Sequence, residues 1–369
     1  MFKVYKFQDL VSPTRKVRGM KTDEYKDSGK YPVIDQGKDF IAGYSDNENA
    51  LYKDTLPVVI FGDHTLAIKF VDFPFCAGAD GTQILKPNKE IVIGRFLYYA
   101  ILNLNIKSLG YSRHFKVLKE STFHIPEIED QKRIVKILDR ADALRQKRKQ
   151  AISLLDAYSK SVFLETFGDL SKNPKKWKSG TISELVSEVK YGTSSVASSI
   201  GEFPYLRMNN ITYSGELDIS NLKYIDLKDN DKEKYLAKKG DLLFNRTNSK
   251  ELVGKTTVYN LDVPMAIAGY LIRVRTNEKA IPEYVSGYLN SEHGKRTLEN
   301  MCKSIVGMAN INAKELQKIK ILIPPVDLQI QYKNILEKKS NLKQKMFLQS
   351  EELETQFQAL MQKAFRGEL

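Results

Sequence analysis

The chain has 369 residues, of which 42% are hydrophobic, a size and composition typical of two or three domains that each bury a core. Its formal net charge of +13 favours a polyanionic partner, nucleic acid before others. The two cysteines, Cys76 and Cys302, stand too far apart for a disulfide framework, and no apolar run approaches the roughly 20 residues of a membrane span, so we expect a cytoplasmic protein.

Residues 1–125 predict a first globular α/β block of short strands and one helix. Apolar runs separated by glycines favour strands at 31–34, 40–44, 57–61 and 66–70. The apolar run from Gly94 to Leu104 favours a helix, and a polar loop at 110–114 follows it.

A long amphipathic helix is predicted over residues 126–168, and the chain contains it twice. The segment that begins at Ile125-Pro126 returns without a gap 198 positions later, at Ile323-Pro324. Glycine and proline are confined to the ends of each copy, as expected for helix boundaries. Apolar residues recur every three or four positions in both copies and make a narrow stripe. The repeat therefore orders the chain as block, helix, block, helix.

A helix of that length needs a partner, and the simplest partner is the other copy, packed against it as a coiled coil. The alternative is that each helix is only the core helix of its own half. The stripe positions predicted to pack the helices together, or against partner proteins, are Ile137, Leu138, Leu144, Leu155, Ile335, Leu336, Leu342 and Leu353.

Residues 169–323 form a second predicted block that loosely repeats the order of the first. Its segments 203–207, 241–244 and 282–289 correspond to 31–34, 58–61 and 94–104, and its polar loop 307–312 corresponds to 110–114. The predicted divisions are a first recognition block at 1–125, a central helix at 126–168, a second block at 169–323 and a C-terminal helix at 324–369.

One segment is similar to a phosphate-binding loop but departs from it in two places. The run from Ser249 to Thr256 ends in Gly-Lys-Thr, yet Ser249 occupies the position of the first glycine. The residues Thr257-Val258 that follow favour a strand, whereas the motif requires a helix. A nucleotide-driven enzyme would need ATP binding that Lys255→Ala abolishes.

Other catalytic signatures are missing from the sequence. It carries no glycine-rich dinucleotide or methyl-donor turn, no DNA methyltransferase signature, and four histidines without metal-binding spacing. Asp63 and Lys69 lack the acidic-x-Lys order of a nuclease. We therefore expect a non-catalytic protein without a metal or a cofactor.

Loops that cluster arginine with asparagine suit contacts to the base edges of DNA. Arginine bonds guanine in bidentate fashion, asparagine does the same with adenine, and lysines such as Lys250 and Lys255 hold phosphates. The predicted DNA-binding residues are Arg15, Arg18, His64, Arg113, His114, Arg207, Asn209, Asn210, Asn245, Arg246, Thr247 and Asn248. The alternative is that such loops satisfy their own turns through side chains. Arg273 and Arg275, in an alternating strand segment, are predicted to lie on a solvated face.

This layout resembles the DNA-specificity subunit of type I restriction-modification systems. The resemblance covers essentially the whole chain and is most specific at the Ile-Pro elements that open the helices, with Gln131 and Gln329 closing them. The segments 240–247 and 207–211 also resemble elements of such recognition domains. The first copy departs from the family's Ile-Pro-Pro pattern, with Glu127 as its third residue.

The resemblance implies an α+β fold with two α/β target recognition domains, each of which reads one half of a split double-stranded DNA sequence. It implies that the two helices pack antiparallel, separate the domains and relate them by a pseudo-twofold axis. The helices are expected to dock two methyltransferase subunits, which restriction (translocase-nuclease) subunits join, and these partners carry the catalytic sites. A helical scaffold without sequence-specific DNA binding is the alternative.

Overall fold

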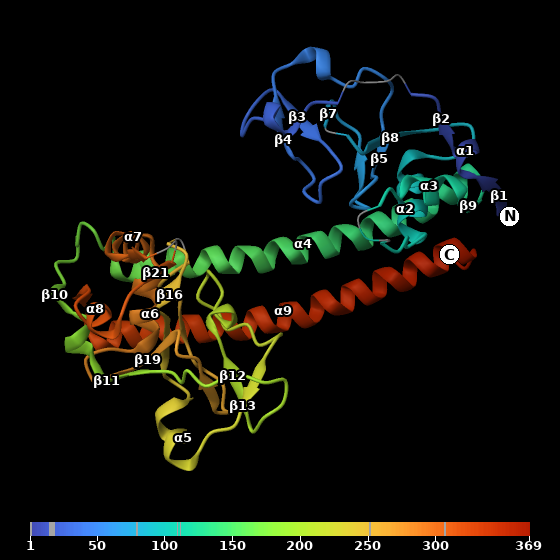
Figure 1. The fold of residues 1–369 in the computed structure, drawn as a ribbon. Helices are drawn as coiled ribbons and strands as arrows, with labels where there is room; N and C mark the ends of the chain where they lie inside the picture. The colour runs from blue at the N-terminus through green and yellow to red at the C-terminus, as the bar shows by residue number, and fades with distance from the viewer. Residues whose placement is uncertain are drawn as a thin grey trace. The chain divides into compact units, whose positions relative to one another are not determined.

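The computed structural model describes residues 2–14, 19–78, 80–108, 110, 112–250, 252–305 and 308–369. The chain divides into two compact units, each of which combines an α/β part with portions of two long helices. Unit 1 comprises Met1–Lys149 and Leu348–Leu369, and unit 2 comprises Gln150–Phe347. The long helices are α4 (Ile128–Phe167) and α9 (Val326–Arg366) (Figure 1). The predicted division that treats each helix as a separate domain stays a prediction.

The two long helices begin and end where backbone chemistry requires. Each begins shortly after a proline, and each ends next to a glycine with positive φ, Gly168 at 81° and Gly367 at 78°. Glycine adopts this left-handed conformation without a steric penalty, so it terminates a helix readily. Within the described ranges, no helix combines the length and the apolarity needed to cross a membrane.

The α/β part of unit 1 consists of two small sheets and one principal helix. The antiparallel four-stranded sheet has the order β2 (Val11–Ser12), β8 (Thr82–Pro87), β5 (Val58–Gly62), β6 (Ile68–Val71). The second sheet has the order β4 (Gly43–Ser45), β3 (Tyr31–Ile34), β7 (Cys76–Ala77), with β3 parallel to β7. Helix α2 (Gly94–Asn103) packs on the larger sheet, and its Phe96 and Leu97 share one core with Val59 and Phe61.

A strand pair connects this α/β part to the start of α4. β1 (Lys3–Lys6) pairs antiparallel with β9 (Thr122–Ile125), and β9 leads into the helix through Pro126. The remaining short elements of the unit are α1 (Phe7–Leu10), η1 (Thr22–Glu24), η2 (Glu48–Ala50) and α3 (Phe115–Glu120).

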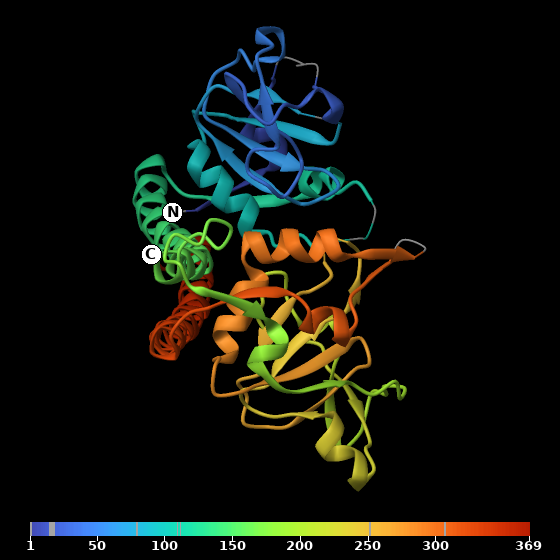
Figure 2. The same cartoon turned by 90° about the vertical axis from the view of Figure 1, so that its left-hand side faces the viewer.

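Unit 2 repeats the strand order of the larger sheet with different residues, and its second sheet has one strand more. Its larger sheet has the order β11 (Val186–Tyr191), β19 (Leu271–Thr276), β15 (Leu242–Asn245), β17 (Thr256–Val258). Its second sheet has the order β13 (Lys223–Ile225), β12 (Phe203–Leu206), β18 (Met265–Ile267), β14 (Leu236–Ala237), with β12 parallel to β18. Helix α6 (Pro282–Asn290) takes the place of α2, and Figure 2 shows the yellow and orange elements of this unit from a second direction.

The connection to the second long helix is repeated as well. β10 (Lys178–Thr181) pairs antiparallel with β22 (Lys320–Ile323), which leads into α9. Unit 2 adds a small sheet of β16 (Thr247–Asn248), β21 (Met308–Asn310) and β20 (Lys303–Ile305). Its other elements are η3 (Ile182–Leu185), η4 (Met208–Asn210), α5 (Asp229–Tyr235), α7 (Glu292–Met301) and α8 (Ala313–Gln317).

The long helices pack antiparallel within each unit, which confirms their predicted pairing. In unit 1, Arg145 Nη2 on α4 lies 2.6 Å from Glu354 Oε2 on α9. In unit 2, Lys343 Nζ on α9 lies 2.7 Å from Asp156 Oδ1 on α4, and also bonds Glu216 of the α/β part at 2.8 Å. Arg145 and Lys343 are the same position of the sequence repeat, as are Asp156 and Glu354. Each ion pair is therefore the repeat-related copy of the other.

The predicted packing positions fall into two groups. Leu138 is fully buried, and the half-buried side chains are Ile137, Leu155, Ile335, Leu336 and Leu353. Leu144 and Leu342, which are one repeat apart, are 56% and 49% exposed. The structure therefore corrects the prediction for these two: they do not pack between the helices, because the partner helix covers a different face. They stay predicted contacts to partner proteins.

Candidate nucleic-acid interface

Arg246 directly follows strand β15, and its guanidinium lies over an aromatic ring. Its guanidinium carbon lies 5.0 Å from the centre of the Tyr191 ring, and the Tyr191 hydroxyl accepts a hydrogen bond from Ala313 N at 2.8 Å. The Arg246 backbone donates to Tyr270 O at 3.0 Å and accepts from Ile311 N at 2.9 Å. Its Nε has no hydrogen-bond partner among the described residues. Because this Nε is buried, only the Nη groups at the end of the guanidinium are left to donate to a ligand.

The residues around Arg246 have divided roles. Thr247 and Asn248 form the half-buried edge strand β16, and Thr247 Oγ1 donates to Asn310 Oδ1 at 3.0 Å. Asn245 is fully buried, and its backbone bonds Lys255 O and Gly254 N. Burial removes the Asn245 side chain from the surface, so we revise its predicted role from base contact to shaping of the turn.

Arg207 and Asn210 hold a loop rather than present themselves to solvent. Asn210 is 3% exposed, and its Nδ2 donates to Asp218 O at 2.8 Å. Arg207 Nη2 donates to Asn221 O at 2.8 Å, and its backbone N donates to Asn210 Oδ1 at 2.9 Å. Asn209, between them, is exposed. The predicted base contact of Asn210 is therefore revised to support of the 211–222 loop, whereas Asn209 remains accessible.

The corresponding loops of unit 1 meet in the same way. His114 is fully buried, with its backbone N and its Nδ1 each 2.9 Å from Asp63 O. Phe115 N also donates to Asp63 Oδ1 at 2.8 Å. We revise His114 to a residue that fastens two loops together, as the bond between Ile311 and Arg246 does in unit 2. Arg113 is exposed and His64 is half-buried, while Arg15 and Arg18 lie outside the described residues.

The segment similar to a phosphate-binding loop has a different structure. Lys255 is followed by strand β17, as predicted, and its Nζ donates to Met208 O at 3.0 Å. Burial lowers the pKa of Lys255. Its ammonium therefore supports the η4 turn, and no helix starts behind it to receive a nucleotide phosphate.

A second lysine lies beside this segment in a small hollow with Lys250, Val253 and Gly254. Lys295 Nζ donates to Tyr213 O at 3.0 Å, and desolvation, with the nearby charge of Lys160, lowers its pKa to about 8. Neither Lys295 nor Tyr191 is among the predicted site residues, because contacts between segments distant in the sequence place both of them. Glu299 also lines the hollow, but Lys250, Lys255 and Lys295 outnumber it, and the net positive charge suits phosphate groups of a polyanion.

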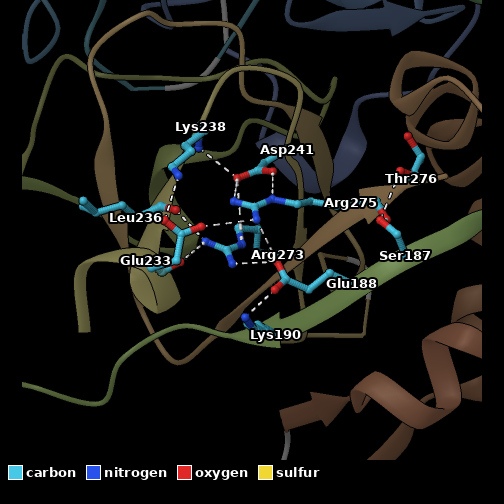
Figure 3. A network of polar contacts seen from close by, with 10 residues as sticks. All are labelled: Ser187, Glu188, Lys190, Glu233, Leu236, Lys238, Asp241, Arg273, Arg275 and Thr276. Atoms are coloured by element: carbon cyan, nitrogen blue, oxygen red, sulfur yellow. Dashed lines mark hydrogen bonds and ion pairs between the residues drawn. The ribbon is translucent and has the colours of Figure 1, made fainter. Parts of the chain in front are cut away.

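Arg273 is not on a solvated face, contrary to the sequence-based prediction. It is fully buried, and its guanidinium donates to Glu188 Oε2 at 2.8 Å and to Leu236 O at 2.6 Å (Figure 3). Arg275 Nε donates to Asp241 Oδ1 at 2.8 Å in the same network. Burial does not alternate along β19, because α5 and strand β14 of the second sheet cover the side on which Arg273 lies.

The network favours the ionised form of Glu188. Burial alone would raise the pKa of Glu188, but its hydrogen bond from Lys190 and the charge of Arg273 bring that pKa below its ordinary value. The hydrogen bond to Asp241 raises the pKa of Arg275. These groups bond one another and backbone carbonyls, so the network joins the two sheets of unit 2 and belongs to its scaffold.

Comparison with known proteins agrees with this layout. The family described as Type I restriction modification DNA specificity domain matches residues 1–154 and 174–351. The chain is 25% identical over 336 residues to the type I restriction enzyme EcoKI specificity subunit of Escherichia coli K12, covering 80% of this chain and 70% of the relative. It is 29% identical over 219 residues to the putative MjaX specificity subunit of Methanocaldococcus jannaschii, covering 58% and 51%.

Solved structures share the fold. The S subunit of a type I restriction-modification system from M. genitalium superposes with a TM-score of 0.61 at 14% identity, covering 99% of this chain and 96% of that one. A chain from a type I R-M system described for its complex assembly and conformational transition gives a TM-score of 0.56 at 17% identity, with 100% and 98% covered.

Two α/β parts on a repeated helix pair, with polar loops at matching places, define a DNA-specificity component of a restriction-modification system. Because the family match spans most of its length, the chain belongs to the Type I restriction modification DNA specificity domain family. The interpretation as a scaffold without sequence-specific DNA binding is not favoured by this membership.

Proposed function

We propose that unit 1 and unit 2 each read one half of a bipartite double-stranded DNA target. The observation that carries this proposal is a shared scaffold with unlike loops. Strands β5 and β15 occupy the same place in equivalent sheets, yet the residues that follow them are Asp63-His64 in unit 1 and Arg246-Thr247 in unit 2. Loops on a rigid scaffold are where specificity varies most readily.

The residues that we propose for DNA contact are those that the fold leaves accessible. In unit 2 they are Arg246, Thr247, Asn248 and Asn209, with Lys250 and Lys295 for phosphates. In unit 1 they are His64 and Arg113. Arg15 and Arg18, which lie outside the described residues, stay predicted contacts. His114, Asn210 and Asn245 position the loops that carry these side chains.

The long helices are the proposed dock for the catalytic subunits. We propose two methyltransferase subunits, joined by restriction subunits, and no catalytic site or cofactor in this chain. Apolar side chains remain exposed on both helices, among them Leu144, Leu154 and Tyr158 on α4 and Leu342 and Leu348 on α9. Such exposure on a helix pair supports further helix packing. Because it is proposed to bind chromosomal DNA, we propose that this protein works in the cytoplasm.

Methylome sequencing of the host with and without this gene tests the proposal. The expected result is a split methylated motif that disappears when the gene is deleted and returns with a plasmid copy. Deletion without any change in methylated motifs would overturn it. Binding of duplex DNA by the complex should weaken steeply with salt, because phosphate contacts release counterions.

A further inference from the structure

The repeated glutamine that closes the Ile-Pro element has a complete set of hydrogen bonds in unit 1. Gln131 lies in the first turn of α4 and is fully buried. Its Nε2 donates to Ile91 O at 2.8 Å and to Pro126 O at 2.8 Å. Its Oε1 accepts from Ile93 N at 2.9 Å. Ile93 is the N-cap residue of α2, so the side chain of one helix holds the start of another.

Unit 2 repeats this arrangement bond for bond. Gln329 is fully buried in the first turn of α9, and its Oε1 accepts from Ile281 N at 2.9 Å. Its Nε2 donates to Pro324 O at 2.9 Å and to Lys279 O at 3.3 Å. Ile281 is the N-cap residue of α6. An equivalent glutamine amide therefore joins α4 to α2 in unit 1 and α9 to α6 in unit 2.

The three bonds of each glutamine restrict movement in more than one direction. The amide bonds a backbone N–H and a backbone carbonyl that lie two residues apart on the segment leading into α2 or α6. It also bonds a carbonyl just before its own long helix. In unit 1, α2 packs on β5, whose end carries the Asp63-His64 loop. A shift or rotation of α2 along α4 would break buried hydrogen bonds that no water replaces.

Other contacts between these helices differ from unit to unit. In unit 1, Arg95 Nε on α2 donates to Asp139 Oδ1 at 2.6 Å. In unit 2, Glu283 on α6 lies 3.6 Å from Lys333 Nζ, and Tyr284 packs against Phe163. The glutamine contact is thus common to both units although the surrounding contacts are not, which sets it apart from ordinary core packing.

We infer that Gln131 and Gln329 are positioning residues that fix each recognition part on its long helix and thereby restrict the complex to one spacer length between half-sites. The inference rests on the proposed function. The two buried amides thus determine how strictly the complex requires one spacer length, whereas the loops determine which bases each half-site contains.

The test uses the full complex and a set of duplexes that differ in spacer length by one base pair on either side of the native motif. The variant Gln131→Met keeps the volume of the side chain and removes all three hydrogen bonds. Gln131→Glu keeps the acceptor for Ile93 N but cannot donate when ionised. Gln146→Met, at an exposed position of the same helix, is the matched control. Gln329→Met repeats the test in unit 2.

The measured quantity is the ratio of the methylation rate on the native spacer to the rate on the altered spacers. We expect this ratio to fall about tenfold for Gln131→Met, because buried hydrogen bonds no longer oppose the shift. Gln131→Glu should lower it at least as far, because its carboxylate would face the carbonyl oxygens of Ile91 and Pro126. Gln146→Met should keep the wild-type ratio, and base substitutions in a half-site should remain as harmful as before.

A uniform loss of rate on all spacers, with the wild-type ratio retained, would overturn the inference and leave a purely stabilising role. If Gln131→Met does not fold, the ratio measured with Gln329→Met decides in the same way. A wild-type complex without any bipartite motif would instead contradict the proposed function, so the two failures are distinguishable.

Discussion

The larger sheets of the two units have the same strand order but differ in the side chains at equivalent positions. At equivalent places on β8 and β19, Ile84 pairs with Ile60 in unit 1, and Arg273 pairs with Leu243 in unit 2. Ile84 packs in an apolar cluster, whereas Arg273 is buried among carboxylates and carbonyls. The comparison teaches that the scaffold tolerates a change from an apolar to a charged interior when each buried charge finds partners.

The largest expected effect is on stability, when the buried charge of unit 2 is replaced by the apolar residue type of unit 1. Arg273→Ile gives unit 2 the type of residue that unit 1 has, and leaves Glu188 and Asp241 without one cation. We expect the free energy of unfolding to fall by about 3 kcal/mol, the lower end of the cost of breaking a buried ion pair, because Glu188 and Asp241 keep their ion pairs with Arg275. Urea denaturation measures it, with exposed Arg296→Ala as control. A loss below about 1 kcal/mol would show that the network is dispensable.

The next effect is on DNA binding and distinguishes the proposed DNA-contacting loops from the scaffold that carries them. Arg246→Ala removes the guanidinium beside Tyr191 and should weaken binding of the cognate duplex about 10- to 100-fold, the range of one bidentate base contact. Only the half-site read by unit 2 should lose discrimination, and assembly with methyltransferase should be unchanged. Equal binding by Arg246→Ala and Arg296→Ala would contradict this assignment.

A smaller effect is expected for pH dependence in unit 2. The pKa of Lys295 is lowered to about 8 from the ordinary 10.5, so the unfolded chain binds more protons between these values. The free energy of unfolding should therefore rise with pH from about 8 to 10.5, by no more than about 1 kcal/mol given partial exposure. Denaturation at pH 8 and 10 measures this rise, and Lys295→Met should lack it. The same rise in Lys295→Met would refute the assignment.

The smallest effect on the chain itself is expected at the repeat-related leucines. Leu144→Asp and Leu342→Asp change exposed positions, so each should alter the free energy of unfolding by less than about 0.5 kcal/mol. Both should nevertheless reduce co-purification of the methyltransferase, and to similar extents if the repeat docks two copies. Wild-type co-purification with both variants would remove these leucines from the proposed dock.

Much of the fold follows from periodic features that a sequence displays directly. The repeat and its helix ends, the strands near 31–34 and 57–61, and the helix near Gly94 are set by local spacing and by glycine and proline. Arg273, Asn245 and His114 could not be predicted, because their burial depends on which segment lies across from them. Leu144 belongs to the stripe but faces away, since 3.6-residue geometry lets a stripe drift around a long helix.

The most direct experiment replaces the α/β part of unit 1 by that of unit 2. A chain in which residues 169–323 replace 1–125, with both long helices retained, should assemble with methyltransferase and carry the same reader twice. Methylome sequencing should then show a split motif whose two halves carry the same base sequence, that of the unit 2 half-site. An assembled complex that methylates the original motif, or a motif with unlike halves, would contradict the claim that each unit reads one half-site.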